Sequence, residues 1–288
     1  MLRPRDIRRR FDRAAESFDD ADFVHAVTRA GLVARLEPLL VDARRVLDLG
    51  AATGSTGRAL RRRFRRVHVV SLDASHRMAV QSTKKAGWLS RSSAVQADAS
   101  RLPFADACFD IVVANQLLPW LPDPQQAFGE IARVLKEGGV FAFATLGPDS
   151  LQTLRAAWVA ADESPLSDMH VHRFADMHDI GDGLVRAGLA DPVLDVDRLS
   201  VSYENTDRLF TDLTLAGARN ALADRARGLT GRRRFEAMRR ALGSENEAGN
   251  IILDLELVYG HCWGTGPAGD PQDFRIPAGR IPLRDKRR

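Results

Sequence analysis

The residues whose types and spacing suggest chemistry begin at position 44, where the chain reads RRVLDLGAATGSTGR. Asp48 lies in a short apolar run, and Gly50 and Gly54 lie in the turn of small residues that follows it. Glycines allow the backbone to turn sharply and let a ligand approach the start of the next helix. A strand, a glycine turn and a helix in this order are typical of nucleotide-binding folds. The pattern predicts a nucleotide-like ligand, although a turn that merely requires glycine would read the same way.

The charge and spacing of this loop narrow the class of ligand. The loop lacks the G-x-G-x-x-G spacing of dinucleotide folds, and no G-x-x-x-x-G-K-[ST] phosphate loop follows it. The carboxylate of Asp48 would repel a pyrophosphate and would attract a ligand that carries an ammonium or a sulfonium. We therefore expect S-adenosylmethionine rather than NAD or ATP.

More polar residues stand at the ends of the strands predicted downstream. Asp73 follows the second apolar run and can accept hydrogen bonds from both hydroxyls of a ribose. Asp98 follows the third, where it suits either an adenine amino group or a helix cap. Asn115 and Gln116 end the fourth, and Trp120 follows in a loop as a candidate pocket wall. Parallel strands end at one edge of a sheet, so we expect these residues at one site.

The elements that must position these residues alternate between strands and helices. Apolar runs and helical patterns follow one another, and Gly138 with Gly139 is expected to end the last helix of the series. This alternation implies an α/β fold with a doubly wound, mostly parallel sheet. The predicted strands are 46–49, 67–72, 93–96, 109–115 and 140–145, and the predicted helices are 7–18, 24–40, 56–64, 77–87 and 124–135.

The second half of the chain is predicted to complete the sheet and to add a cap. Helices are expected at 151–161 and 179–187, and strands at 193–203 and 251–263 are expected to form an antiparallel pair at the sheet edge. The interval 205–250 is too long for a hairpin turn and has helical periodicity, which indicates an inserted helical cap. The predicted division is 1–40 for N-terminal capping helices, 41–203 and 251–265 for the core, 204–250 for the cap, and 266–288 for a basic C-terminal tail.

Composition and charge exclude several classes of protein. The chain has 288 residues, with no apolar run that could cross a membrane and no apolar stretch of a secretory signal. Cys108 and Cys262 are too few for a disulfide framework, so we expect reduced thiols in the cytoplasm. Arginine clusters at 61–66, 232–240 and 284–288 are either solvated faces or a docking surface for an acidic partner. No zinc-finger spacing or aromatic-rich RNA signature points to nucleic acid.

Longer stretches of the sequence resemble a known family. Class I S-adenosylmethionine-dependent methyltransferases carry landmarks in the same order as LDLGAATG, SLDAS, QADASRLPFADACFDIVVANQLLPWL and RVLKEGGVFAFATLG in this chain. More narrowly, the chain resembles the malonyl-(acyl carrier protein) O-methyltransferase family (BioC family) of early biotin synthesis in RFDRAAESFDDA, TLGPDSLQTLRAAW, HRFADMHDIGDGLVRAGLADPVLD, YGHCWG and FRIPAGRIPLR. The resemblance covers nearly the whole chain. The stretch GPDSLQTLR also resembles the mitochondrial complex I assembly methyltransferase-like family.

The resemblance implies a seven-stranded, Rossmann-like methyltransferase core that binds S-adenosylmethionine. Two positions depart from the family pattern, because Ala52 replaces the second glycine of the loop and Phe18 replaces a frequent tyrosine. The methyl group of Ala52 adds bulk where backbone and ligand approach closely, and Phe18 cannot donate a hydroxyl. The residues carried over as cofactor-binding are Asp48, Gly50, Ala52, Gly54, Asp73, Asp98, Asn115 and Phe18.

The family implies methylation of the free carboxylate of a malonyl thioester on acyl carrier protein, which gives the methyl ester that primes pimeloyl and biotin synthesis. A carboxyl group is already ionised at neutral pH, so we expect no catalytic base. Arg173 is the candidate that would orient this carboxylate through its guanidinium fork, unless it pairs with Asp176 or Asp179. The neighbouring His170 and His172 would need a carboxylate ligand and suitable geometry to bind a metal, and we expect none.

The expected partner is the carrier protein, docked on the arginine-rich surface of a monomer. Two other functions fit the same cofactor site. One is a methyltransferase that acts on another small metabolite or a quinone, and the other is a complex I assembly-factor-like protein that binds S-adenosylmethionine. Salt distinguishes them, because turnover that depends on an acidic carrier should fall steeply with ionic strength.

Overall fold

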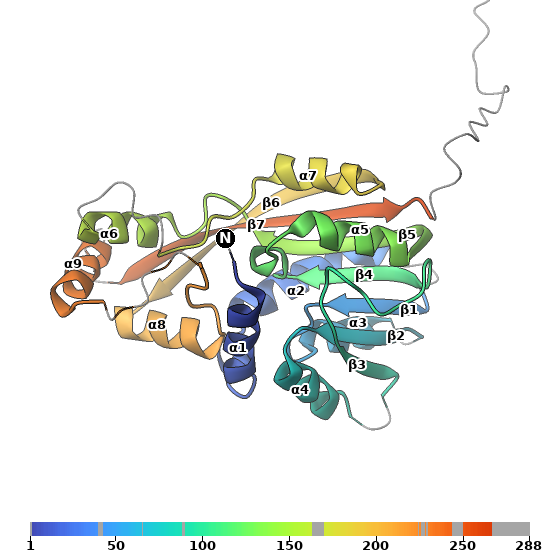
Figure 1. The fold of residues 1–288 in the computed structure, drawn as a ribbon, viewed down its shortest axis with the longest axis horizontal. Helices are drawn as coiled ribbons and strands as arrows, with labels where there is room; N and C mark the ends of the chain where they lie inside the picture. Colours follow the sequence, from blue (N-terminus) through green and yellow to red (C-terminus); the bar gives the residue numbers. More distant parts are fainter. Residues whose placement is uncertain are drawn as a thin grey trace, which may run out of the picture.

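The computed structural model is organised around one seven-stranded sheet with the strand order β3-β2-β1-β4-β5-β7-β6 (Figure 1). β1 to β5 pair in parallel, whereas β7 runs antiparallel to both β5 and β6. This sheet confirms the predicted fold class. The strands are β1 (Arg45–Leu49), β2 (His68–Asp73), β3 (Ser92–Gln96), β4 (Phe109–Asn115), β5 (Leu135–Leu146), β6 (Leu189–Tyr203) and β7 (Ile251–Gly264). The structure describes residues 2–39, 43–64, 66–87, 90–162, 170–223, 225, 228, 230–243 and 250–266.

Helices cover both faces of the sheet. Leu32 and Leu60, from α2 and α3, pack in the apolar cluster of one face, and Ile131 and Leu184, from α5 and α7, pack in that of the other. β1 contributes to both clusters and is buried from Val46 onward, as expected of a central parallel strand. The helices are α1 (Pro4–Ala14), α2 (Phe23–Leu36), α3 (Ser55–Arg63), α4 (His76–Ala86), α5 (Pro124–Val134), α6 (Gln152–Asp162), α7 (Met177–Arg186), α8 (Thr206–Leu215) and α9 (Arg232–Gly243).

Several predicted helix ends differ from the structure, and the helix predicted at 24–40 ends at Leu36, where a short 3₁₀ helix, Glu37–Leu39, follows. The helix predicted at 7–18 ends at Ala14, and a short 3₁₀ helix covers Phe18–Ala21. The helix predicted to reach residue 135 and to be stopped by Gly138 and Gly139 ends at Val134, and both glycines lie inside β5. Leu135 already pairs with Phe109, so strand pairing replaces the helix before the glycines are reached.

Helices α6, α8 and α9 lie together at the end of the molecule where β6 and β7 extend beyond the other strands (Figure 1). They share an apolar cluster that includes Trp158, Leu209 and Met238. The described part of the interval 205–250 therefore contains two helices, and α6 from the preceding segment packs beside them.

Some predicted features fall outside the described residues. Residues 267–288 are among them, and they hold the C-terminal arginine cluster and the whole FRIPAGRIPLR stretch. Within the described part of the chain, no helix is both long enough and apolar enough to cross a membrane.

Candidate active site

The loop after β1 passes through three residues with positive φ. These are Gly50 (φ +69°), Ala52 (φ +46°) and Gly54 (φ +79°), and Gly54 is the N-cap of α3. A Cβ at Gly50 would lie 2.8 Å from Cδ1 of Leu117, so this position requires glycine for its backbone and for space. Ala52 occupies the left-handed region, which L-residues rarely adopt, and donates its backbone N–H to Asp73.

Asp73, at the end of β2, is the anchor of this loop. Its Oδ2 accepts the N–H of Ala52 at 2.8 Å, and its Oδ1 accepts the N–H of Ser75 at 2.8 Å. Burial raises the pKa of Asp73 to about 6, although the two backbone N–H groups act in the opposite direction. Each carboxylate oxygen retains acceptor capacity beyond its backbone bond. Asp73 can therefore hold a pair of hydroxyl groups from a ligand.

Asp48 has a different position from the one the sequence suggested. Its side chain is 1% exposed, and its Oδ2 accepts the N–H of Gly57, in the first turns of α3, at 2.8 Å. Burial raises the pKa of Asp48 to about 7. The carboxylate lies beneath the glycine loop rather than in the cavity beside it, so it supports the loop and does not face a ligand directly.

The small cavity, with a volume of about 290 Å³, lies at the carboxyl ends of the parallel strands. It brings together most of the predicted cofactor residues, which are Phe18, Gly50, Ala52, Asp73, Asp98 and Asn115. Asp48 and Gly54 do not line it. Asp98 uses Oδ1 to accept the N–H and hydroxyl of Ser100, so it also stabilises its own turn.

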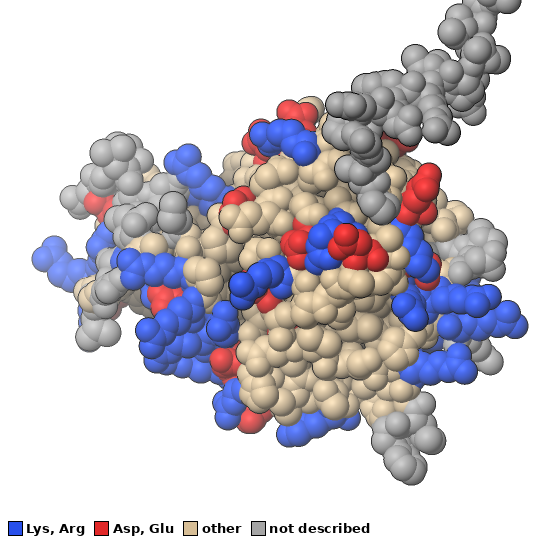
Figure 2. Space-filling view, turned by 45° about the vertical axis from the view of Figure 1, so that its right-hand side comes forward, with Lys and Arg blue, Asp and Glu red and all other residues tan. Residues whose placement is uncertain are grey.

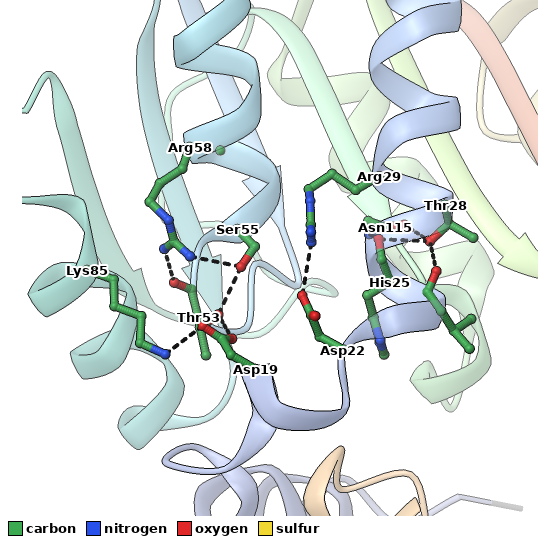
Figure 3. A network of polar contacts seen from close by, with 12 residues as sticks. Asp19, Asp22, His25, Thr28, Arg29, Thr53, Ser55, Arg58, Lys85 and Asn115 are labelled. Atoms are coloured by element: carbon green, nitrogen blue, oxygen red, sulfur yellow. Dashed lines mark hydrogen bonds and ion pairs between the residues drawn. The ribbon is translucent and has the colours of Figure 1, made fainter. Parts of the chain in front are cut away.

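A polar network fixes the N-terminal segment over the glycine loop (Figure 3). Asp19 accepts the hydroxyl of Thr53 at 2.6 Å and the ammonium of Lys85 at 2.6 Å. Farther along, Thr28 donates to Oδ1 of Asn115 at 2.7 Å, and the Asn115 amide donates to the carbonyl of His25 at 3.0 Å. These contacts tie the 3₁₀ helix Phe18–Ala21 to the glycine loop and α4, and tie α2 to the end of β4. Asn115 is thus a structural link as well as a cavity residue.

The large cavity, with a volume of about 520 Å³, lies between the sheet edge and helices α1, α6 and α8. Most of its lining is apolar and aromatic, and it includes Trp158, Leu209 and Leu253. Three arginines also line it: Arg10, Arg219 and Arg225. Sequence patterns did not single out any of the three.

The two cavities meet at four residues that line both of them, namely Phe11, His25, Gln116 and Trp120. Phe11 and Trp120 form an edge-to-face pair with ring centroids 5.0 Å apart. Nδ1 of His25 and Nε2 of Gln116 are buried without a hydrogen-bond partner among the described residues. Burial lowers the pKa of His25 to about 4, so its ring is neutral at neutral pH. We call these four residues the junction.

Arg173, the predicted orienting residue, lies elsewhere. Its side chain is exposed and lines a third cavity, together with Asp179 and Arg186. The adjacent His172 faces the large cavity, and its Nε2 accepts the N–H of Ala221 at 3.1 Å. The structure therefore separates Arg173 from the junction. Among the described residues, no three His, Cys, Asp or Glu side chains are grouped as a metal site.

Arginines gather on the surface of the helical end. In Figure 2, blue side chains cluster at the left, where α8 and α9 lie. α9 begins with Arg232, Arg233 and Arg234 and carries Arg240 in its last turn. Arg232 pairs with Glu236 on the same helix, and Arg234 contacts Asp162 of α6.

Comparison with known proteins gives concordant matches. The family model described as "Methyltransferase domain" matches residues 47–143. Malonyl-[acyl-carrier protein] O-methyltransferase of Halorhodospira halophila is 39% identical over 92% of this chain and 89% of its own length. The protein of the same name from a Methylovorus species is 41% identical over 89% of this chain and 88% of its own length. The YcgJ protein of Bacillus subtilis superposes with a TM-score of 0.58, at 20% identity, over 83% of this chain and 99% of that one.

Proposed function

The chain belongs to the malonyl-[acyl-carrier protein] O-methyltransferase family, and from this premise we propose that it methylates the free carboxylate of a malonyl thioester on acyl carrier protein. We propose S-adenosylmethionine as the methyl donor and the methyl ester, a precursor of the pimeloyl part of biotin, as the product. The similarity to these relatives confirms the predicted family, and the matching methyltransferase domain confirms the predicted class of enzyme.

The main support for this proposal is that the two adjoining cavities are lined by side chains of opposite charge. The charged side chains around the small cavity are Asp73, Asp98, Asp123 and Arg8, which favour a ligand with positive charge. Those around the large cavity are Arg10, Arg219, Arg225 and Asp212, and Asp212 pairs with Arg208 at 3.2 Å. The large cavity therefore favours an anion. A cationic methyl donor and a carboxylate acceptor fit this pair of sites.

The donor set of the small cavity fits S-adenosylmethionine. Asp73 can accept the ribose hydroxyls, and the glycine loop brings the backbone close to the ligand. Phe18 is buried against Ala52 and lies with its ring centroid 5.0 Å from that of His25, so it closes one side of the cavity. Asp98 lines the far part, where it can accept an amino group.

Little acid–base chemistry is required of the protein. S-adenosylmethionine supplies a methyl group on a positively charged sulfur. The acceptor carboxylate is already ionised at neutral pH, so no side chain has to remove a proton. The aromatic pair Phe11 and Trp120 keeps the junction apolar, which helps exclude the water that would stabilise the separated charges. Alignment of donor and acceptor provides the rest of the rate enhancement.

Mass spectrometry tests the proposed function. Malonyl-carrier protein is incubated with the enzyme and S-adenosylmethionine, and acetyl-carrier protein, which lacks the free carboxylate, serves as the control. We expect one added methyl group on the malonyl thioester and none on the acetyl thioester. An unmodified malonyl thioester, or methylation of both, would overturn the proposal.

The carrier is proposed to dock on α9 of a monomeric enzyme in the cytoplasm. Arg233 and Arg240 are exposed there, and carrier proteins present acidic helices. Arg233→Glu with Arg240→Glu should lower kcat/KM for the malonyl carrier but not for malonyl-pantetheine. Arg62→Glu, which reverses an exposed charge on α3, is the matched control. If the α9 double variant and Arg62→Glu change kcat/KM for the malonyl carrier equally, the carrier does not bind at α9.

A further inference from the structure

We propose that two residues recognise the acceptor carboxylate, namely Gln116 at the junction and Arg10 in the wall of the large cavity beside it. Arg219 and Arg225 complete the positively charged wall beside them. This inference rests on the proposed function and assigns to it the residues that bind the acceptor.

Gln116 is held in place and has an unused donor. Its side chain is 6% exposed, its φ is +58°, and its backbone N–H donates to the carbonyl of Ala144 at 2.7 Å. This fixes the residue at the end of β4, facing both cavities. Nε2 lacks a hydrogen-bond partner within the described residues, and an unmatched buried donor destabilises the protein. An oxygen of a bound acceptor would satisfy it.

Arg10 is the available cation of the large cavity. Arg219 donates to Oγ1 of Thr214 and to a backbone carbonyl, and Arg225 pairs with Asp6 at 3.4 Å. Arg10, by contrast, forms neither a side-chain hydrogen bond nor an ion pair with any described residue. Burial and the nearby Arg225 lower the pKa of Arg10, whereas the carboxylate of Asp6 acts in the opposite direction. An anion beside Arg10 would relieve both effects.

Arg10 also lies close to the junction. It precedes Phe11, one of the four junction residues, in α1. Burial and, after it, the charge of Arg10 lower the pKa of His172 to about 4, and the His172 ring lies 5.1 Å from that of Trp120, another junction residue. His172 is therefore neutral and does not compete for the carboxylate. Asp6, which lies one turn before Arg10 on α1 and does not line the cavity, pairs with Arg225 at 3.4 Å.

The pairing of a neutral amide with a guanidinium suits the reaction. Arg10 attracts the carboxylate into an apolar cavity, and Gln116 can hold one of its oxygens through a single N–H. A neutral donor withdraws less charge than a cation would, so the second oxygen remains nucleophilic toward the methyl group. Thioesters without a terminal carboxylate would gain neither contact and would be poor ligands.

The test uses malonyl-pantetheine, so that carrier docking does not enter. We compare wild type with Arg10→Gln, Arg10→Lys and Gln116→Ala. Arg9→Gln serves as the matched control, because Arg9 is an exposed neighbour on α1 and lines neither cavity. Loss of one charge-assisted contact should raise KM by about 10- to 100-fold in Arg10→Gln, with kcat changed much less. Arg10→Lys should recover part of this loss, Gln116→Ala should raise KM, and Arg9→Gln should match wild type.

Binding gives a second readout. Calorimetry with S-adenosylhomocysteine should give the same Kd for Arg10→Gln and wild type, which shows that the variant is folded, whereas malonyl-pantetheine should bind more weakly. If KM and Kd for malonyl-pantetheine are unchanged in both Arg10→Gln and Gln116→Ala, the assignment is overturned while the methyltransferase activity stands. If wild type itself fails to methylate any malonyl thioester, the proposed function fails instead.

Discussion

Replacing Asp48 by asparagine should remove a pH-dependent cost to the stability of the ligand-free protein. Asp48 is buried beneath the glycine loop, and its folded pKa is about 7 against an ordinary value of 3.8. A carboxyl group with a raised pKa binds its proton more tightly in the folded state. Stability therefore falls as pH rises from about 4 to about 7. Asparagine cannot ionise, and its side-chain oxygen can still accept the N–H of Gly57.

The size of the effect follows from the shift. One pKa unit corresponds to about 1.4 kcal/mol, so a shift of about three units costs roughly 4 kcal/mol once the group is ionised in both states. Between about pH 5 and about pH 8, the free energy of unfolding of Asp48→Asn relative to wild type should rise by roughly 2.5 kcal/mol. Other titrating groups are shared by the two proteins and largely cancel in this difference.

Urea denaturation of both proteins at the two pH values measures this quantity. The free energy of unfolding of Asp48→Asn should rise relative to that of wild type as the pH rises. The position of the carboxylate also predicts that S-adenosylhomocysteine affinity changes little, because Asp48 does not line the small cavity. A stability difference that stays flat with pH would refute the reasoning about burial.

Three further predictions concern the same region. Calorimetry should show that S-adenosylhomocysteine binds more tightly as the pH rises through about 6, because the ionised carboxylate of Asp73 is the stronger hydrogen-bond acceptor. Asp73→Asn should weaken this binding by roughly 10- to 100-fold and should abolish its dependence on pH. Gly54→Ala should destabilise the protein to urea by at least about 1 kcal/mol, since Gly54 has a left-handed backbone (φ +79°) and a Cβ there would crowd the hydroxyl of Ser82, and an unchanged stability would contradict this. Thr28→Val should cost about 1–3 kcal/mol in urea denaturation because it leaves the buried oxygen of Asn115 unpaired, and no change would show that the bond is dispensable.

The sequence predicted the core of the fold well because its signals are local. Apolar runs such as 109–115 are typical of strands in a parallel sheet that is buried on both faces, and the strands lie where those runs occur. Gly50 and Asp73 were expected at one edge of the sheet because parallel strands end there, and both line the small cavity. Gly138 misled the prediction, because pairing of Leu135 across the sheet overrides the local signal to end a helix.

The acceptor side of the site was not visible in the sequence. Arg10 lies in a helix with several other arginines, and only the packing of α1 over the strand ends distinguishes it from its exposed neighbours. Gln116 was expected at the ligand-binding edge of the sheet, but its positive φ and its place between the two cavities could not be predicted from the residue pattern. Arg173 was chosen for its chemistry, but it lies on the opposite side of its segment from His172 and faces a different cavity.

The central claim is that donor and acceptor occupy two adjoining cavities that meet at Gln116. A crystal structure of the enzyme with S-adenosylhomocysteine and malonyl-pantetheine tests it most directly. The account predicts ribose hydroxyls on Asp73 and the malonyl carboxylate beside Gln116, facing the sulfur of the nucleoside. A nucleoside in the large cavity, or a carboxylate beside Arg173 in the third cavity, would contradict it.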